Sequence, residues 1–184
     1  MACASFSVKH LPKIKHFQGW LQELLTVWRS LSRAEQVFCI TALFAGILLR
    51  AQHLARPMVH DETFTYAVFV KPGILHTLFR YDYANNHIFH SLLVYFSTIF
   101  RSSEVFIRLP AFFFSLSSLL LLFLFARRFF GVAAALFALS LSALSYYQID
   151  YAHNARGYSM NIFFSLLSAY GIFSVIRDPL GKTA

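Results

Sequence analysis

The chain has little charge, little cysteine and few chain-breaking residues. Of its 184 residues 13% are charged and eight are acidic, and it has two cysteines, seven glycines and five prolines. So little charge cannot cover the surface of an ordinary soluble domain, which excludes that class. Cys3 and Cys39 lie far apart, and Cys39 is inside an apolar run, so neither a disulfide framework nor a paired-cysteine metal site is indicated.

What the chain has in abundance is apolar surface. Hydrophobic residues make up 58% of it, and the mean hydropathy is +0.57. These values predict an integral membrane protein. The formal charge of +8 does not indicate nucleic-acid binding, because the Lys and Arg residues stand in short clusters beside apolar runs, where they set membrane orientation.

The length of the apolar runs predicts which of them cross the membrane. The expected spans are residues 37–55, 108–126, 129–149 and 157–176. The run 88–100 would cover only about 20 Å as a helix, against a hydrocarbon core of about 30 Å, so we expect it to lie at the interface or against other helices. The predicted fold is therefore all-α: a polytopic membrane protein with about four transmembrane helices, plus interfacial helices in a long outer loop, 56–107.

An arginine, a proline and a glycine have expected places in this scheme. Arg50, near the end of the first span, should extend toward the headgroups. Pro110 should lie in the first turn of the second span, where its missing N–H does no harm. Gly157 should let a substrate approach the backbone closely.

The charge distribution predicts the orientation of the chain. Residues 1–35 form a basic amphipathic segment, expected to lie flat on an anionic membrane surface, with an ordinary packed helix as the alternative. If 88–100 does not cross, this segment, the Arg127-Arg128 pair and the tail 177–184 share one side, as the positive-inside rule requires. We therefore expect both termini in the cytoplasm and the loops with Asp61 and Asp150 on the opposite side.

Two adjacent carboxylates, Asp61 and Glu62, follow the first span directly. Carboxylates near lipid are costly unless they are used, which indicates a functional site; the alternative is the first turn of a helix, where negative charge is favoured. The topology places them on the same rim as Asp150 and Arg156. A carboxylate there could take a proton from an acceptor hydroxyl or amine. The fork of Arg156 matches phosphate oxygens, with an interfacial anchor as its alternative role.

Three histidines near these carboxylates are candidate metal ligands. They are His60, His87 and His90. Their spacing matches no compact metal-binding signature. Structural or solvent-facing histidines are the alternative.

Several short motifs follow one another along the chain, each of them once. They are Asp61-Glu62, Asn85-Asn86-His87, Arg108-Leu109-Pro110, Ala126-Arg127-Arg128 through Gly131, and Asn154-Ala155-Arg156-Gly157-Tyr158. With the expected topology, this order resembles the polytopic C-type glycosyltransferases (GT-C superfamily) that use lipid-phosphate-linked sugars. That group includes protein O-mannosyltransferases, lipid A aminoarabinose transferases and oligosaccharyltransferases. The resemblance covers residues 31–176.

The resemblance implies roles for particular residues. Asp61 would be the catalytic carboxylate, Glu62 its neighbour in the donor or metal site, and Asp150 the acid of the second loop. The implied donor-phosphate-binding residues are Asn85, Asn86, His87 and Arg156. Many relatives carry Glu where this chain has Asn154, so the cofactor stays open, with a divalent metal as the candidate.

The resemblance also implies a function. We expect transfer of a sugar from a polyprenyl-phosphate-linked donor to an acceptor at the outer face of a membrane, with a bacterial cytoplasmic membrane as the expected location. Membrane lipids and a polytopic partner subunit are the other expected partners. Relatives generally have more spans and often a soluble C-terminal domain, so the alternative is a truncated, non-catalytic scaffold or a subunit of a split glycosyltransferase. A transporter is disfavoured because the spans lack midplane helices broken by Gly or Pro.

Overall fold

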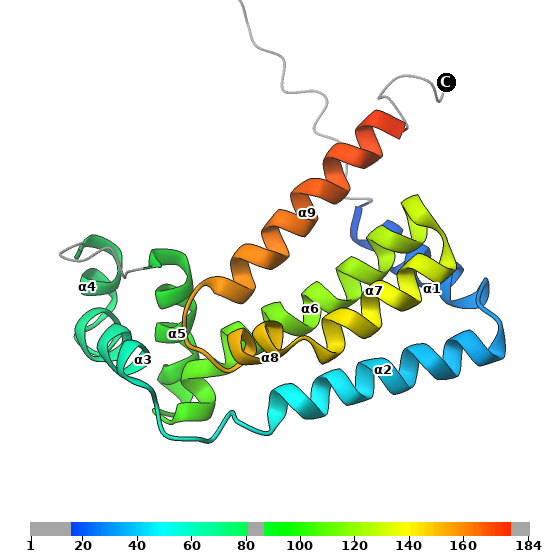
Figure 1. Cartoon of the computed structure of the whole chain (residues 1–184). Helices are drawn as coiled ribbons and strands as arrows, with labels where there is room; N and C mark the ends of the chain where they lie inside the picture. Colours follow the sequence, from blue (N-terminus) through cyan, green and yellow to red (C-terminus); the bar gives the residue numbers. More distant parts are fainter. Residues whose placement is uncertain (1–15, 81–86, 178–184) are drawn as a thin grey trace, which may run out of the picture.

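A computed structural model describes residues 16–80 and 87–177, which form helices joined by turns, with no strand among them (Figure 1). The helices are α1 His16–Arg29, α2 Arg33–Ala51, α3 His60–Thr65, the π-helix η1 Tyr66–Val70, α4 Ile74–Phe79, α5 Ile88–Phe100, α6 Glu104–Phe130, α7 Val132–Leu144, α8 Tyr146–Ala152 and α9 Tyr158–Arg177. The all-helical prediction is confirmed.

The number of possible spans is three or four within the described residues. Helices α2, α6 and α9 are long and apolar enough to cross a membrane, and α7 with α8 makes a fourth only if the pair, bent by 61°, counts as one span. The expected run 129–149 is therefore not one helix, because α6 continues to Phe130 and the rest of the run divides into α7 and α8. The break falls at Ser145, whose backbone is extended. Helix α5 has the expected bounds and is too short to be counted as a span.

Helix α6 is the centre of the bundle and packs against α7, α9 and α5 (Figure 1). It starts at Glu104, so Pro110 lies in its second turn, not in its first as expected. A proline has no N–H, so the carbonyl of Phe106, one turn earlier, loses its helical partner. The hydroxyl of Ser97 on α5 donates to that carbonyl at 2.7 Å. Helix α5 thus compensates for the proline and is tied to α6.

Helix α2 packs closely against α7 because Gly46 faces it. A Cβ on Gly46 would lie 3.3 Å from the Cβ of Ala143. One turn later Arg50 is fully buried, so the expectation that it extends to the headgroups is wrong. Its guanidinium donates to Oγ of Ser115 at 2.9 Å and to the carbonyls of Ser142 and Ala143 at 2.9 and 3.0 Å. These carbonyls end α7 and lack helical partners, so Arg50 caps the broken helix.

The bundle has two chemically different ends. At one, which we call the basic end, the last turn of α6 is tied both to the α1–α2 joint and to the last turn of α9. Arg127 donates to Oγ of Ser30 at 3.3 Å, and Arg177 donates to the carbonyl of Arg128 at 2.6 Å. The opposite end, which we call the site end, is formed by α3, η1, α4, α8 and residues 153–157. This grouping agrees with the charge argument, and the membrane side that each end faces stays a prediction.

Candidate functional site

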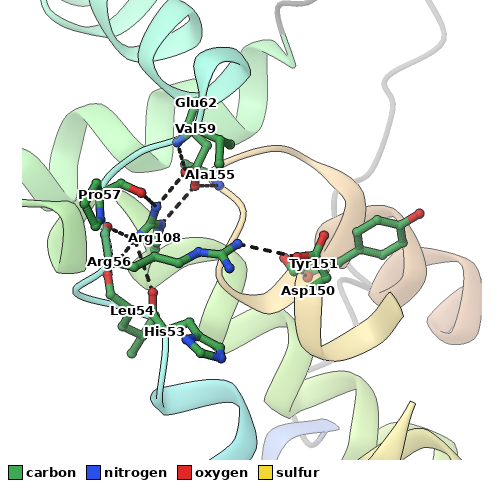
Figure 2. Close-up of polar contacts among 11 residues, drawn as sticks. His53, Leu54, Arg56, Pro57, Val59, Glu62, Arg108, Asp150, Tyr151 and Ala155 are labelled. Carbon is green, nitrogen blue, oxygen red and sulfur yellow. Dashed lines mark hydrogen bonds and ion pairs between the residues drawn. The ribbon is translucent and has the colours of Figure 1, made fainter. Parts of the chain in front are cut away.

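Glu62 and Arg108 form a buried ion pair at the site end (Figure 2). Nε of Arg108 lies 2.9 Å from Oε1 of Glu62 and Nη2 lies 2.6 Å from Oε2, and both side chains have zero exposure. Two parallel N–H···O bonds are the strongest geometry for such a pair. The carboxylate also accepts from the backbone N–H groups of Ala155 at 2.7 Å and Val59 at 3.1 Å. Asp61 and Glu62 both lie in the first turn of α3, so the expected alternative of carboxylates in a helix's first turn is observed for both.

The carboxyl of Glu62 is stabilised in its charged form. Burial by itself raises the pKa of Glu62, but the hydrogen bonds from Arg108, Ala155 and Val59 outweigh this, and the pKa is lowered overall. Both carboxylate oxygens are engaged by these donors. Glu62 therefore does not fit the donor or metal site that the resemblance implies for it.

Arg108 also holds the chain between α2 and α3 (Figure 2). Its Nη1 donates to the carbonyls of His53, Leu54 and Arg56 at 3.2, 2.9 and 2.6 Å, and Nη2 donates to the carbonyl of Pro57 at 3.3 Å. These carbonyls lie beyond the end of α2, where the helix no longer supplies partners. One side chain on α6 thus fixes the whole connection that leads to α3.

Asp61 points away from this buried pair. Its side chain is 53% exposed, and Oδ2 accepts from Nη1 of Arg156 at 2.7 Å. The guanidinium of Arg156 lies over the ring of Tyr158, 5.0 Å from its centroid. Since Ala155 is bonded to Glu62, the adjacent carboxylates on α3 hold two adjacent residues of the second loop. The predicted convergence of the two loops is therefore observed.

His87 joins the Asp61–Arg156 pair. A Cβ on Gly157 would lie 3.1 Å from Cγ of His87, so any larger residue here would press on the imidazole. The expectation that Gly157 leaves room for a substrate is wrong, because His87 takes that space. The ring of His87 also packs against Tyr158, with 5.9 Å between centroids. Burial, and then the charge of Arg156, lower the pKa of His87, which favours the neutral imidazole.

Asp150 belongs to a neighbouring cluster (Figure 2). Its Oδ1 lies 3.5 Å from Nη2 of Arg56, and both side chains are about one-third exposed. His153 is buried beside them, with its ring centroid 5.2 Å from that of His53. Burial, and then the charge of Arg56, lower the pKa of His153 to about 4. Asp150 is thus tied to the same connection that Arg108 holds, and it has Arg56 as its ionic partner.

Of the remaining predicted residues, the structure describes only His60 and His90. Asn85 and Asn86 lie outside the described residues. The side chain of His60 is almost fully exposed, with Nδ1 3.7 Å from Oδ1 of Asp61. His90 is fully buried without a hydrogen-bond partner on either nitrogen. Within the described part of the chain, no group of three or more His, Cys, Asp or Glu side chains could hold a metal ion.

The role of Arg108 is what sequence reasoning missed. The sequence marked it as part of a motif and as the start of a span, without a partner. A signal was present, because an arginine next to a long apolar run needs an acceptor, and the chain has only eight acidic residues to offer. Asp82 and Glu104 precede Arg108 more closely than the Asp61-Glu62 pair does, so the sequence did not single out Glu62 as that acceptor.

Comparisons of the chain with protein-family models, curated proteins and solved structures give no match. The fold and the geometry together define a class: an all-helical protein with three to four apolar helices long enough to span a membrane, and a polar site at one end of its bundle. Any more particular function is argued below from that geometry.

Proposed function

We propose that the chain is the catalytic module of a membrane glycosyltransferase, which moves a sugar from a polyprenyl-phosphate donor to an acceptor at the site end. The observation that supports this is the 2.7 Å contact between Asp61 and Arg156, which joins two loops 95 residues apart. It combines an exposed carboxylate, able to accept a proton, with a guanidinium able to bind phosphate.

The chemistry assigned to these two residues is a single displacement. An acceptor hydroxyl oxygen forms a bond with the anomeric carbon of the donor sugar while its proton passes to the carboxylate of Asp61. The bond between that carbon and the phosphate oxygen breaks, and polyprenyl phosphate leaves with the electron pair. Arg156 stabilises the charge on the leaving phosphate, because the fork of a guanidinium matches phosphate oxygens.

The buried Glu62–Arg108 pair gives this arrangement its rigidity. Glu62 anchors Ala155, the residue before Arg156, and Arg108 anchors the connection before α3. Groups held in place before the reaction lose little freedom during it, which lowers the barrier. We therefore propose that Glu62 and Arg108 act as positioning residues.

An apolar groove beside α6 supports a lipid-linked donor. A cavity of about 440 Å³ between α5 and α6 has an almost wholly apolar lining that includes Leu93, Phe113 and Phe114. It shares Ser117 with a second apolar cavity of about 270 Å³ between α6 and α9. The two cavities line one side of a candidate span, where a prenyl chain in the bilayer can reach them.

A transfer assay tests the proposal. The purified full chain, in proteoliposomes with polyprenyl-phosphate sugars and a mixed acceptor pool, should transfer labelled sugar. Asp61→Asn should lower the rate by about 100-fold or more, the usual contribution of a general base. Glu104→Gln, which removes a carboxylate from the first turn of α6, is the matched control and should keep the rate. Equal transfer by Asp61→Asn and the parent, with equal melting temperatures, would overturn the proposal.

A further inference from the structure

A third cavity, at the site end, differs in its lining from the two apolar cavities beside α6. It has a volume of about 460 Å³ and lies between η1 and α5. Its walls include the side chains of Tyr66, Lys71, Tyr95, Thr98 and Ser102. They bring two aromatic rings, one ammonium group and several hydroxyls together, which is the mixture of apolar surface and polar groups that fixes a small ligand.

The π-helix η1 is what aims Lys71 into this cavity. The backbone N–H of Lys71 donates to the carbonyl of Tyr66 at 2.8 Å, which closes a turn one residue wider than that of an α-helix. In an α-helix a residue five positions later would be rotated by about 140°. The wider turn places Tyr66, Val70 and Lys71 on one side, and all three line the cavity. Such turns are rare and occur frequently at functional sites.

The turn that follows Lys71 is tied to the interior. Thr77 is fully buried, and its hydroxyl donates to the carbonyl of Phe69 at 2.8 Å. Gly73 has φ +115°, a conformation that other residues rarely adopt. The ammonium group of Lys71 is thus carried by a defined backbone.

The cavity and the Asp61–Arg156 pair are connected through one packed cluster. Tyr66 and Tyr95 pack against the buried residues Val70, Val94, Ile107 and Ala155. Ala155 is the residue bonded to Glu62, and it directly precedes Arg156. A ligand in the cavity therefore contacts the same cluster that supports the catalytic pair.

We propose that this cavity is an acceptor subsite for an anionic saccharide, a sugar that carries a phosphate or a carboxylate. Each tyrosine offers an apolar ring for the C–H face of a sugar and a hydroxyl for its polar edge. Lys71 offers a compact positive charge for the anionic group. The hydroxyl of Thr98 donates to the carbonyl of Val94 at 2.9 Å, which leaves its oxygen as an acceptor for a sugar hydroxyl. The acceptor role rests on the proposed function, whereas the binding does not.

Calorimetric titration of the detergent-solubilised full chain tests the binding. Glucose 1-phosphate should bind saturably, and more tightly than glucose or inorganic phosphate alone, because it alone engages both the rings and the ammonium group. Lys71→Gln should weaken the binding by about tenfold and Tyr66→Phe by about threefold, as expected for one charged and one neutral hydrogen bond. The matched control Arg29→Gln removes one charge at the basic end and should leave the affinity unchanged.

The source of the saccharide is decided in a second arm. If nanodiscs with phosphatidylinositol displace glucose 1-phosphate from the parent protein, the site binds a lipid headgroup. If they do not displace it, the site binds a free or polymer-borne sugar. Either result supports an anionic saccharide site. No saturable binding of glucose 1-phosphate, or equal affinity in a folded Lys71→Gln protein, would overturn the proposal.

One further variant separates this inference from the transferase proposal. Asp61→Asn should bind glucose 1-phosphate as the parent does. Binding without any sugar transfer would keep the saccharide site and overturn the transferase. Sugar transfer that Lys71→Gln does not change, together with no binding of glucose 1-phosphate, would keep the transferase and overturn the saccharide site.

Discussion

Two arginines, Arg50 and Arg108, have an environment opposite to that of Arg177. Arg50 and Arg108, in the half of the bundle nearer the site end, have zero exposure, whereas Arg177 at the basic end is exposed. The two buried arginines donate to carbonyls at places where helices stop, in the last turn of α7 and in the residues after α2. Arg177 extends from the last turn of α9, where a cation is favoured by the helix dipole and by headgroups.

The difference shows where a buried charge is tolerated in this protein. Burying a guanidinium is costly unless its N–H groups find acceptors. Helix ends supply carbonyl acceptors in groups, and both buried arginines lie beside such ends. Arg108 has a carboxylate partner as well, whereas the described hydrogen bonds of Arg50 go to neutral oxygens. We therefore expect the loss in free energy of unfolding to differ when each arginine is replaced.

The largest effect is expected at Arg108. Arg108→Met leaves the carboxylate of Glu62 buried without its cation and should lower the free energy of unfolding by about 3–5 kcal/mol. Chemical unfolding in detergent, followed by circular dichroism, measures it. The double variant Arg108→Met with Glu62→Met should recover most of the loss, because no uncompensated charge remains. A double variant no more stable than the single one would show that the carbonyl contacts, and not the ion pair, dominate.

A smaller effect is expected at Arg50. Arg50→Gln removes donors from the carbonyls of Ser142 and Ala143 but leaves no buried charge, so the loss should be about 1–3 kcal/mol. The same unfolding measurement checks it, and hydrogen exchange at the end of α7 should increase locally. Unchanged stability together with unchanged exchange would refute the assignment of Arg50 as the cap of α7.

The smallest effect is expected at Arg177. Arg177→Gln removes an exposed donor to the carbonyl of Arg128 and should change the free energy of unfolding by less than about 1 kcal/mol. Since the substitution is the same as at Arg50, the two results compare directly. A loss at Arg177 as large as that at Arg50 would abolish the distinction between the two ends.

Length arguments predicted some helices well. The run 88–100 was expected as one short helix and is observed as α5 with those bounds, and α9 lies within one residue of the expected span at each end. These helices end where apolar residues give way to polar ones, which the sequence displays. The start of α6 was missed because it lies in the mixed stretch Glu104–Ile107, ahead of the apolar run.

The break after α7 could not be predicted in this way. No Pro or Gly marks Ser145, and the run around it is apolar enough to be read as one helix. The carbonyls freed by the break are satisfied by Arg50, which is distant in the sequence. Whether the chain bends there depends on a contact that only the packed bundle supplies.

The candidate site, too, could be predicted from the sequence only in part. Motif and topology brought Asp61, Glu62, Asp150 and Arg156 to one end of the bundle, and the structure places them there. The sequence did not tell which of the two adjacent carboxylates is buried, because neighbours on a helix point about 100° apart and either could face inward.

By itself, then, the sequence determined the all-helical, apolar character of the protein and the placement of Asp61, Glu62, Asp150 and Arg156 at one end of the bundle, because both follow from the order of apolar and charged residues along the chain. Tertiary structure alone decided that Glu62 is locked to Arg108 while Asp61 stays exposed beside Arg156. It also decided that Arg50 caps a broken helix and that a π-turn directs Lys71 into a cavity. Each of these depends on partners from distant segments, since a buried polar group is stable only where packing brings it an acceptor or donor.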